Sequence, residues 1–328
     1  MTGQHTNRLK EAAAFCCFLA ALLGFVWLAS ALLIPHREVY GANWGGYAKE
    51  KRGSLDAIFF GSSIVYCDVV PAVIYDRAGI ASYVLAGPEQ TLTATEYYVK
   101  EAFRTQSPRL AAVEVNGAFY SEYTAYTKAN IGYMPPSLNR LLATFRAAEP
   151  EERLGLLFPL VNYHDEWPHF QNLRYDADNL AGYTPMAEAN QIGGIYERPV
   201  EAFSQAVFDR NIESLREIVR FCKSRDCKVL FFLAPNHQPW EGSYRAMLEE
   251  ELKTIEGADF IDFNRRFDEE ELSGYRDFYD PQHLNTRGAE TFSAYLAGIV
   301  KSYVDTPREP DKTLWEERVN AFKTVRAE

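Results

Sequence analysis

The sequence predicts a three-layer α/β/α domain that follows an N-terminal transmembrane helix. Residues 12–34 form an apolar run with no charged side chain inside it. Beyond this run, short and continuous apolar segments alternate with helical ones, which is typical of a parallel sheet covered by helices on both faces. At 328 residues the chain is long enough for one large α/β domain with insertions.

The apolar run at residues 12–34 is long enough to cross a membrane. As a helix it would measure about 34 Å, against a bilayer core of about 30 Å. Arg8 and Lys10 precede it, which favours a cytoplasmic N-terminus at residues 1–11 and an extracytoplasmic C-terminal domain in a single-pass protein of the cell membrane. The alternative is a cleaved signal peptide with Ala-Ser-Ala at residues 29–31 as its site. The run exceeds the ~7–15 residues of a signal core, so an anchor is favoured.

The composition limits the classes of partner. The formal net charge is −11 and no Lys/Arg cluster forms a basic face, so the sequence predicts no nucleic-acid partner. No His, Cys, Asp or Glu cluster has the spacing of metal ligands, and no Gly-rich loop suits a phosphate or dinucleotide. We therefore expect neither a metal nor a cofactor.

The elements of the α/β domain follow a linker at residues 35–54, which is rich in Gly, Tyr and charged residues. The domain itself is expected at residues 55–304. Its strands are predicted from short apolar runs at residues 56–60, 81–86, 110–115, 228–233 and 260–263. Its helices are predicted at residues 63–78, 89–105, 200–221 and 289–304. The first helix should restart at Pro71 and end before Gly79.

Two further segments flank this pattern. An aromatic-rich insertion at about residues 119–199 separates the third strand from the fourth. Because ligands bind beyond the carboxyl ends of strands in open α/β sheets, the insertion suits a substrate wall or lid; the alternative is a peripheral subdomain that buries its own aromatic side chains. Residues 305–328 should form a C-terminal amphipathic helix, whose Trp315, Val319 and Phe322 pack on the domain.

Two cysteines lie at the end of the helix at residues 200–221 and before the fourth strand. Cys222 and Cys227 could form a disulfide if the domain is extracytoplasmic. The alternative is a pair of half-buried thiols, since their Cα separation is not given by the sequence. Both interpretations stay open.

The first strand ends in Gly61, Ser62 and Ser63. A serine on a turn between a buried strand and a helix exposes its hydroxyl at the sheet edge and its amide at the positive end of the helix. Such a serine suits a nucleophile whose own amide binds an oxyanion. The alternative is a serine that only caps the helix.

A carboxylate and an imidazole stand before the last helix of the domain. Asp280 precedes His283 by three residues, so it can accept the Nδ1 hydrogen and leave Nε2 facing a serine. Alternatively, Asp280 belongs to a turn, and Asn285 or Thr286 caps the helix. Their joint occurrence with the serine turn favours a Ser-His-Asp triad.

These residues resemble the motifs of the SGNH (GDSL-like) hydrolase superfamily over about residues 54–304. The turn at residues 61–63 is similar to its first block, with Ser63 at the nucleophile's place. Gly87 is similar to the glycine of the second block, and Asp280 with His283 to the last block. The resemblance implies a flavodoxin-like fold, a triad of Ser63, His283 and Asp280, and an oxyanion hole that uses the amides of Ser63 and Gly87.

Within the superfamily, the chain is most similar to membrane-anchored extracytoplasmic members with a Gly-Ser-Ser block. These include the D-alanyl-transfer protein of teichoic acid modification and the alginate and peptidoglycan O-acetylation proteins. The resemblance implies a serine O-acyltransferase or esterase, with acetyl as the expected acyl group, that acts on a cell-envelope glycan or acylated carrier. It also implies a multi-span membrane O-acyltransferase as a partner. Transfer and hydrolysis both stay open.

The sequence departs from the family pattern at two places. Ser62 stands where the first block usually has aspartate, as in the anchored branch. The Gly-x-Asn-Asp block is absent after the third strand, where Asn116 is the candidate replacement for the oxyanion-hole asparagine. Removing one oxyanion donor typically costs about 10²–10³ in rate. An alternative function is therefore a catalytically weak glycan-binding or assembly component that works with a membrane O-acyltransferase.

Four aromatic or imidazole side chains are candidates for lining a sugar-binding cleft. Two of them lie in the insertion and two follow the fourth strand, at the edge where ligands bind. A packed or solvated role is the alternative for each. The four are His164, Trp167, His237 and Trp240.

Overall fold

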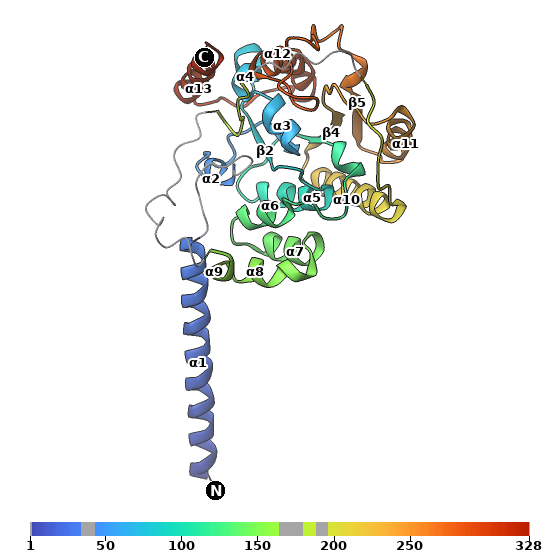
Figure 1. Ribbon diagram of the computed structural model, residues 1–328. Helices are drawn as coiled ribbons and strands as arrows, with labels where there is room; N and C mark the ends of the chain where they lie inside the picture. Colours follow the sequence, from blue (N-terminus) through green and yellow to red (C-terminus); the bar gives the residue numbers. More distant parts are fainter. Residues whose placement is uncertain (1, 34–42, 164–179, 188–195, 328) are drawn as a thin grey trace.

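The computed structural model describes residues 2–33, 43–163, 180–187 and 196–327 (Figure 1). Its centre is a parallel sheet of five strands in the order β2-β1-β3-β4-β5, which is the flavodoxin-like order. The strands are β1 (Ala57–Gly61), β2 (Ser82–Ala86), β3 (Leu110–Glu114), β4 (Lys228–Leu233) and β5 (Ala258–Asp262). The predicted α/β fold with its parallel sheet is confirmed.

Helices cover both faces of the sheet because the central strands are apolar on both sides. In β1, Ile58 and Phe60 belong to one core and Ala57 and Phe59 to the other, and all four are fully buried. The first core contains α5 (Leu92–Ala102) and α10 (Gln205–Lys223). The second contains α3 (Ser63–Asp68), α4 (Pro71–Ala78) and α12 (Thr286–Tyr303).

Local signals decide where these helices begin and end. The first predicted helix is indeed broken, and α4 restarts at Pro71 and ends at Gly79, whose φ of 70° suits glycine. Helix α12 begins earlier than residue 289 because the Asn285 side chain accepts a hydrogen bond from the Gly288 amide at 3.0 Å. Helix α5 begins at Leu92 because Thr91 caps it in the same way.

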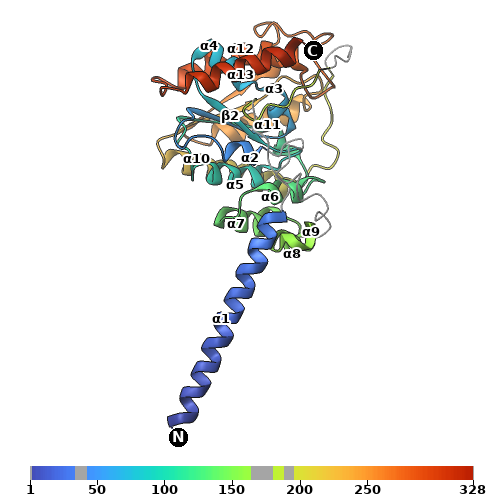
Figure 2. The same ribbon diagram turned by 90° about the vertical axis from the view of Figure 1, so that its left-hand side faces the viewer.

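The N-terminal helix α1 (Thr2–Leu33) projects from the body, and only its C-terminal end lies beside α9 (Pro159–Tyr163) (Figures 1 and 2). Its segment Lys10–Ala29 is long and apolar enough to cross a membrane, and none of that segment is buried in the protein. The short helix α2 (Trp44–Tyr47) lies inside the predicted linker, yet both of its aromatic rings are buried against the domain. The packed structure thus begins before residue 55.

The described part of the insertion is mostly helical up to residue 163, whereas residues 180–187 and 196–199 contain no helix. It contains α6 (Thr127–Tyr133), α7 (Leu138–Ala147), α8 (Arg153–Leu157) and α9, with 3₁₀ turns at Asn116–Phe119 and Pro150–Glu152. In Figure 1 α7, α8 and α9 form the end of the body from which α1 projects.

Two more helices complete the chain. Helix α11 (Gly242–Lys253), which the sequence analysis did not predict, precedes β5, and a 3₁₀ turn at Phe263–Arg265 follows that strand. Helix α13 (Lys312–Ala327) packs on the domain as predicted: Trp315 stacks on Tyr75 with ring centroids 5.1 Å apart, and Val319 and Phe322 are buried. Cys222 and Cys227 are both buried and free in this structure.

Candidate active site

Three side chains from two distant parts of the chain meet at the carboxyl edge of the sheet. The Oγ of Ser63 lies 2.8 Å from Nε2 of His283. On the other side of the ring, Nδ1 lies 2.9 and 2.8 Å from the two carboxyl oxygens of Asp280. An ionised carboxylate can only accept, so Nδ1 carries the hydrogen and Nε2 is left to accept the proton of Ser63.

The strand-turn-helix unit explains the position of Ser63. Ser63 is the first residue of α3, and Ser62 occupies the N-cap position without capping through its side chain. Ser63 is partly exposed whereas Ser62 is buried. A hydroxyl at this place is reachable by a substrate, and its backbone amide lies at the positive end of a helix, although α3 is short.

The loop that carries His283 is held by the carboxylate that orients its ring. Oδ1 of Asp280 accepts hydrogen bonds from the amides of Gln282 and His283, at 2.7 and 2.9 Å. Partial burial acts to raise the pKa of Asp280, but the His283 ring and these two amides outweigh it and hold the pKa below its ordinary value. Asp280 therefore stays a carboxylate throughout the neutral range.

A second buried carboxyl ties this loop to α3. Oδ1 of Asp68 accepts a 2.9 Å hydrogen bond from the amide of Leu284, the residue after His283. Burial raises the pKa of Asp68 well above its ordinary value, opposed by that amide and reinforced by the negative charges of Asp280 and Glu114. Asp68 thus positions the histidine loop against the helix that begins with Ser63.

A third carboxyl lies beneath the serine turn. Ser62 Oγ donates a 3.2 Å hydrogen bond to Glu114 at the end of β3, and the amide of Asn116 donates to the same carboxyl at 2.5 Å. Complete burial raises the pKa of Glu114 to about 8, although these hydrogen bonds act to lower it. The sequence analysis missed Asp68 and Glu114. Their signal was an acidic residue in or next to a buried apolar segment, because such a group needs a partner.

The three oxyanion-hole candidates, Ser63, Gly87 and Asn116, differ in whether their donor groups are already engaged. The amide of Gly87 donates to the carbonyl of Gly61 at 3.2 Å, so this hydrogen bond has to open before Gly87 can bind an oxyanion. The side chain of Asn116 donates to the hydroxyl of Tyr120 at 3.3 Å, and the backbone carbonyl of Asn116 accepts from Trp240 Nε1. Asn130 packs directly on Gly87, where an added Cβ would lie 2.3 Å from its Oδ1. The third candidate, the amide of Ser63, lies at the first residue of α3.

A pocket of about 480 Å³ has Gln282, the residue before His283, in its wall. The guanidinium of Arg198 lies 3.6 Å from the ring centroid of Trp240, and both side chains line the pocket together with Tyr120. Nε and Nη2 of Arg198 are buried and have no hydrogen-bond partner among the described residues. The pocket therefore has an aromatic and cationic wall.

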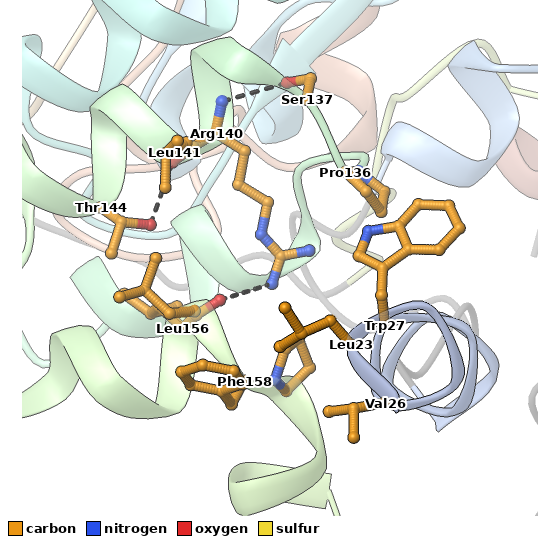
Figure 3. Close-up of a pocket in the computed structure, with 12 residues that line it drawn as sticks. Leu23, Val26, Trp27, Pro136, Ser137, Arg140, Leu141, Thr144, Leu156 and Phe158 are labelled. Atoms are coloured by element: carbon orange, nitrogen blue, oxygen red, sulfur yellow. Dashed lines mark hydrogen bonds between the residues drawn. The ribbon is translucent and has the colours of Figure 1, made fainter. Parts of the chain in front are cut away.

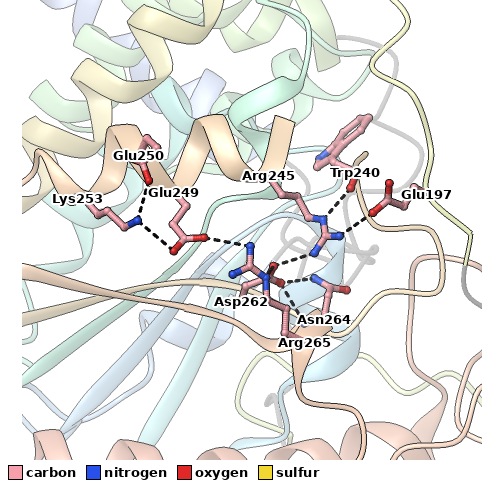
Figure 4. Close-up of polar contacts among 9 residues, drawn as sticks. All are labelled: Glu197, Trp240, Arg245, Glu249, Glu250, Lys253, Asp262, Asn264 and Arg265. Carbon is pink, nitrogen blue, oxygen red and sulfur yellow. Dashed lines mark hydrogen bonds and ion pairs between the residues drawn. The ribbon is translucent and has the colours of Figure 1, made fainter. Parts of the chain in front are cut away.

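An ionic network fixes this wall to the sheet (Figure 4). Arg245 of α11 donates to the carbonyl of Trp240 at 2.8 Å, to Glu197 at 2.8 Å and to Asp262 at the end of β5 at 2.9 Å. Glu197 is adjacent to Arg198 in the chain. The guanidinium of Arg245 therefore contacts the wall both at Trp240 and next to Arg198. The unpredicted helix α11 therefore positions the pocket.

The four predicted cleft residues have different surroundings. Trp240 lines the pocket, although its side chain is largely buried and its Nε1 donates to the carbonyl of Asn116. His237 is buried beside Phe278, with ring centroids 4.5 Å apart, which is a packed environment. His164 and Trp167 lie outside the described residues. Among the residues that the structure describes, no group of three His, Cys, Asp or Glu side chains could hold a metal ion.

Comparisons with known proteins add a distant likeness in structure. No protein-family model matches the sequence, and no curated protein matches it. Among solved structures, the chain is similar to a Bacteroides fragilis protein that is provisionally assigned as an acylhydrolase. The two are 11% identical with a TM-score of 0.38, over 78% of this chain and 92% of the other.

Proposed function

We propose that this chain is a serine acyl-ester enzyme of the SGNH type, either an O-acyltransferase or an esterase. The observation that carries the proposal is the continuous chain of contacts from Ser63 Oγ through the His283 ring to Asp280, with distances of 2.8 to 2.9 Å. Ser63 and His283 are both partly exposed, so a substrate can reach them. This is the arrangement that nucleophilic acyl transfer requires.

The proposed reaction proceeds in two halves. Ser63 Oγ attacks the carbonyl carbon of an acyl ester while its proton passes to His283 Nε2. The oxyanion of the tetrahedral intermediate is bound by the amide of Ser63, joined by Gly87 or Asn116 after a local rearrangement. The alcohol then leaves with the proton from His283, and the acyl group stays on Ser63. A sugar hydroxyl or water, deprotonated by His283, releases the acyl group and restores the serine.

We propose a cell-envelope glycan or acylated carrier as the substrate and acetyl as the acyl group. The pocket that contains Gln282 supports this proposal, because an aromatic ring with a stacked guanidinium offers an apolar face and hydrogen-bond donors to a sugar. Helix α1 supports an anchor in the cell membrane, with the α/β domain outside the cytoplasm. A multi-span membrane O-acyltransferase is then a suitable partner to deliver the acyl group.

Turnover of p-nitrophenyl acetate and labelling by a fluorophosphonate test the nucleophile. The full chain in detergent should show both, and Ser63→Ala should abolish labelling and lower turnover by about 10³-fold or more. Ser302→Ala is the matched control, since Ser302 is an exposed serine of α12 whose hydroxyl bonds only within its own helix. Equal labelling of wild type and Ser63→Ala would reject Ser63 as the nucleophile.

The Gly87 contact favours a second candidate function. Its amide is engaged by the Gly61 carbonyl, which leaves the oxyanion hole incomplete in this state. A catalytically weak component that binds glycan and presents it to a membrane O-acyltransferase needs no complete hole. Such a protein would bind an oligosaccharide of the envelope polymer but would show neither labelling nor turnover.

A further inference from the structure

Helix α7 presents its large apolar side chains to the outside. Leu138, Leu141, Leu142 and Phe145 follow the i, i+3, i+4, i+7 spacing of one helix face, and 41–68% of each side chain is exposed. In a water-soluble protein such a stripe normally faces the core. Here the helix is turned the other way.

The inward side of α7 explains this orientation. It is made of small and polar side chains, among them Arg140 and Thr144, which are buried. Arg140 donates to the carbonyls of Met134 and Leu156, at 3.1 and 3.4 Å, and Thr144 donates to the carbonyl of Arg140 at 3.0 Å. The Thr144 bond lies within α7, but Met134 and Leu156 lie outside it. The helix therefore cannot rotate its leucines inward without breaking the two hydrogen bonds of Arg140.

The exposed stripe continues on the next two helices. Leu154 of α8, Val161 of α9 and Phe158 between them are 61%, 54% and 39% exposed. Outside α1, seven of the large hydrophobic side chains exposed in the described part of the chain lie on this segment, whereas only four lie anywhere else. We call these seven residues the apolar face. A contiguous apolar surface of this kind marks an interaction site.

The position of α1 identifies what covers the apolar face. A cavity of about 420 Å³ separates α7–α9 from α1 (Figure 3). Leu23 and Trp27 of the span line it on one side, and Leu141 and Phe158 of the apolar face on the other. The polar side chains of Ser137, Arg140 and Thr144 also line its wall. Leu23 lies six residues before Ala29, the end of the candidate span, which is about 9 Å along a helix. If α1 crosses the bilayer, the side chains facing Leu23 therefore lie within its outer leaflet, below the surface.

We propose that the apolar face is inserted into the outer leaflet of the bilayer beside α1, and that lipid acyl chains fill the cavity between them. The inference rests on the anchor of the proposed function. Insertion of an amphipathic helical segment to the headgroup and acyl boundary is the ordinary mode of an interfacial membrane contact. With two attachments, the transmembrane helix and the apolar face, the α/β domain is held in one orientation on the membrane.

Fluorescence quenching in lipid vesicles tests this proposal on the full chain. Cys16 and Cys17 are replaced by alanine, and the three remaining cysteines are buried. A single cysteine is then introduced as Phe145→Cys or Leu154→Cys on the apolar face, as Phe18→Cys in α1, or as Lys323→Cys on α13 at the far end of the body (Figure 1). Each variant is labelled with an environment-sensitive NBD dye and reconstituted in phosphatidylcholine vesicles with and without doxyl-labelled lipid.

We expect blue-shifted emission and strong doxyl quenching at positions 145, 154 and 18. At position 323 we expect no blue shift and no quenching. Quenching at position 18 without quenching at 145 and 154 would overturn the proposal and leave the anchor intact. Blue-shifted but unquenched emission at 145 would mean that protein, such as a second copy of the chain, covers the face instead of lipid. Absence of quenching at position 18 as well would reject the anchor and the proposal together.

Discussion

The amide of Leu284 donates a 2.9 Å hydrogen bond to Oδ1 of Asp68, which lies 216 residues earlier in the chain. Asp68 ends the helix that Ser63 begins, and Leu284 follows His283 directly. One buried hydrogen bond therefore sets the distance between the proposed nucleophile and its base. We expect this contact to be as important for activity as for stability.

Two replacements of Asp68 distinguish the loss of its hydrogen bond to Leu284 from the loss of its ionisable carboxyl group. Asp68→Asn keeps an acceptor for Leu284 and should change the free energy of unfolding little at neutral pH. Asp68→Ala leaves a buried amide without a partner, which costs about 1–3 kcal/mol, and should also lower p-nitrophenyl acetate turnover. Urea denaturation and turnover at pH 7 measure both effects. If the alanine and asparagine variants behave alike, Asp68 does not position the loop.

Asp280→Asn should lower turnover by about 10³–10⁴-fold with little change in structure, because an amide can donate to Nδ1 and favour the wrong tautomer. The pKa of Asp280 is held below its ordinary value, so its contribution to stability is present above the unfolded pKa and is lost as the pH falls through the folded one. The stability difference between wild type and the variant should therefore shrink only below about pH 4. A difference that stays constant as the pH falls from 5 to 2 would contradict this account.

Glu114→Gln should change the pH dependence of stability in the opposite direction. With the pKa of Glu114 raised to about 8, the folded state favours the protonated acid, so its contribution is full at low pH and declines as the pH rises through about 8. The glutamine variant, which mimics the neutral acid, should become more stable relative to wild type between about pH 4.5 and 8. Urea denaturation across this range measures the relative change.

The same variant should affect activity. A charge on Glu114 beneath Ser62 opposes the oxyanion on the neighbouring Ser63, so the ratio of wild-type to Glu114→Gln turnover should fall above about pH 8. Glu270→Gln is the matched control, because burial also raises the pKa of Glu270 to about 8. Since Glu270 contacts none of the triad, its variant should share the stability effect alone. A falling ratio for both variants would show that general destabilisation is the cause.

Gly61→Ala should disrupt the serine turn. An added Cβ would lie 2.7 Å from the Cβ of Glu114 and from Cγ2 of Val65, and the φ of Gly61 is 150°. Overpacking of this kind costs about 1–3 kcal/mol and should displace Ser63. Gly53→Ala is the control: its φ is also positive, at 65°, but nothing lies within 4 Å of its added Cβ. It should cost about 1–2 kcal/mol in thermal or urea denaturation without loss of activity.

Much of the fold follows from local patterns in the sequence. Five short apolar runs predict the five strands. The reason is clearest for β1 and β3, because a strand buried on both faces has to be apolar, whereas β5 lies at the edge of the sheet and is only partly buried. Pro71 and Gly79 mark the ends of α4. The serine turn, together with Asp280 and His283, predicts which residues meet at the sheet edge. Helix α11 was missed, since only Leu248 and Leu252 are buried in it and its apolar signal is weak.

The tertiary structure alone decided which groups face one another. Periodicity reveals that α7 has an apolar stripe, but the direction of the stripe depends on Arg140 finding its carbonyl partners inside the insertion. The partners of Glu114 and the engagement of the Gly87 amide likewise arise from contacts between segments that are far apart in the chain. The sequence determines which residues can carry chemistry because that depends on their type and local turn. Their environment, and with it their pKa and exposure, is a property of the packed chain.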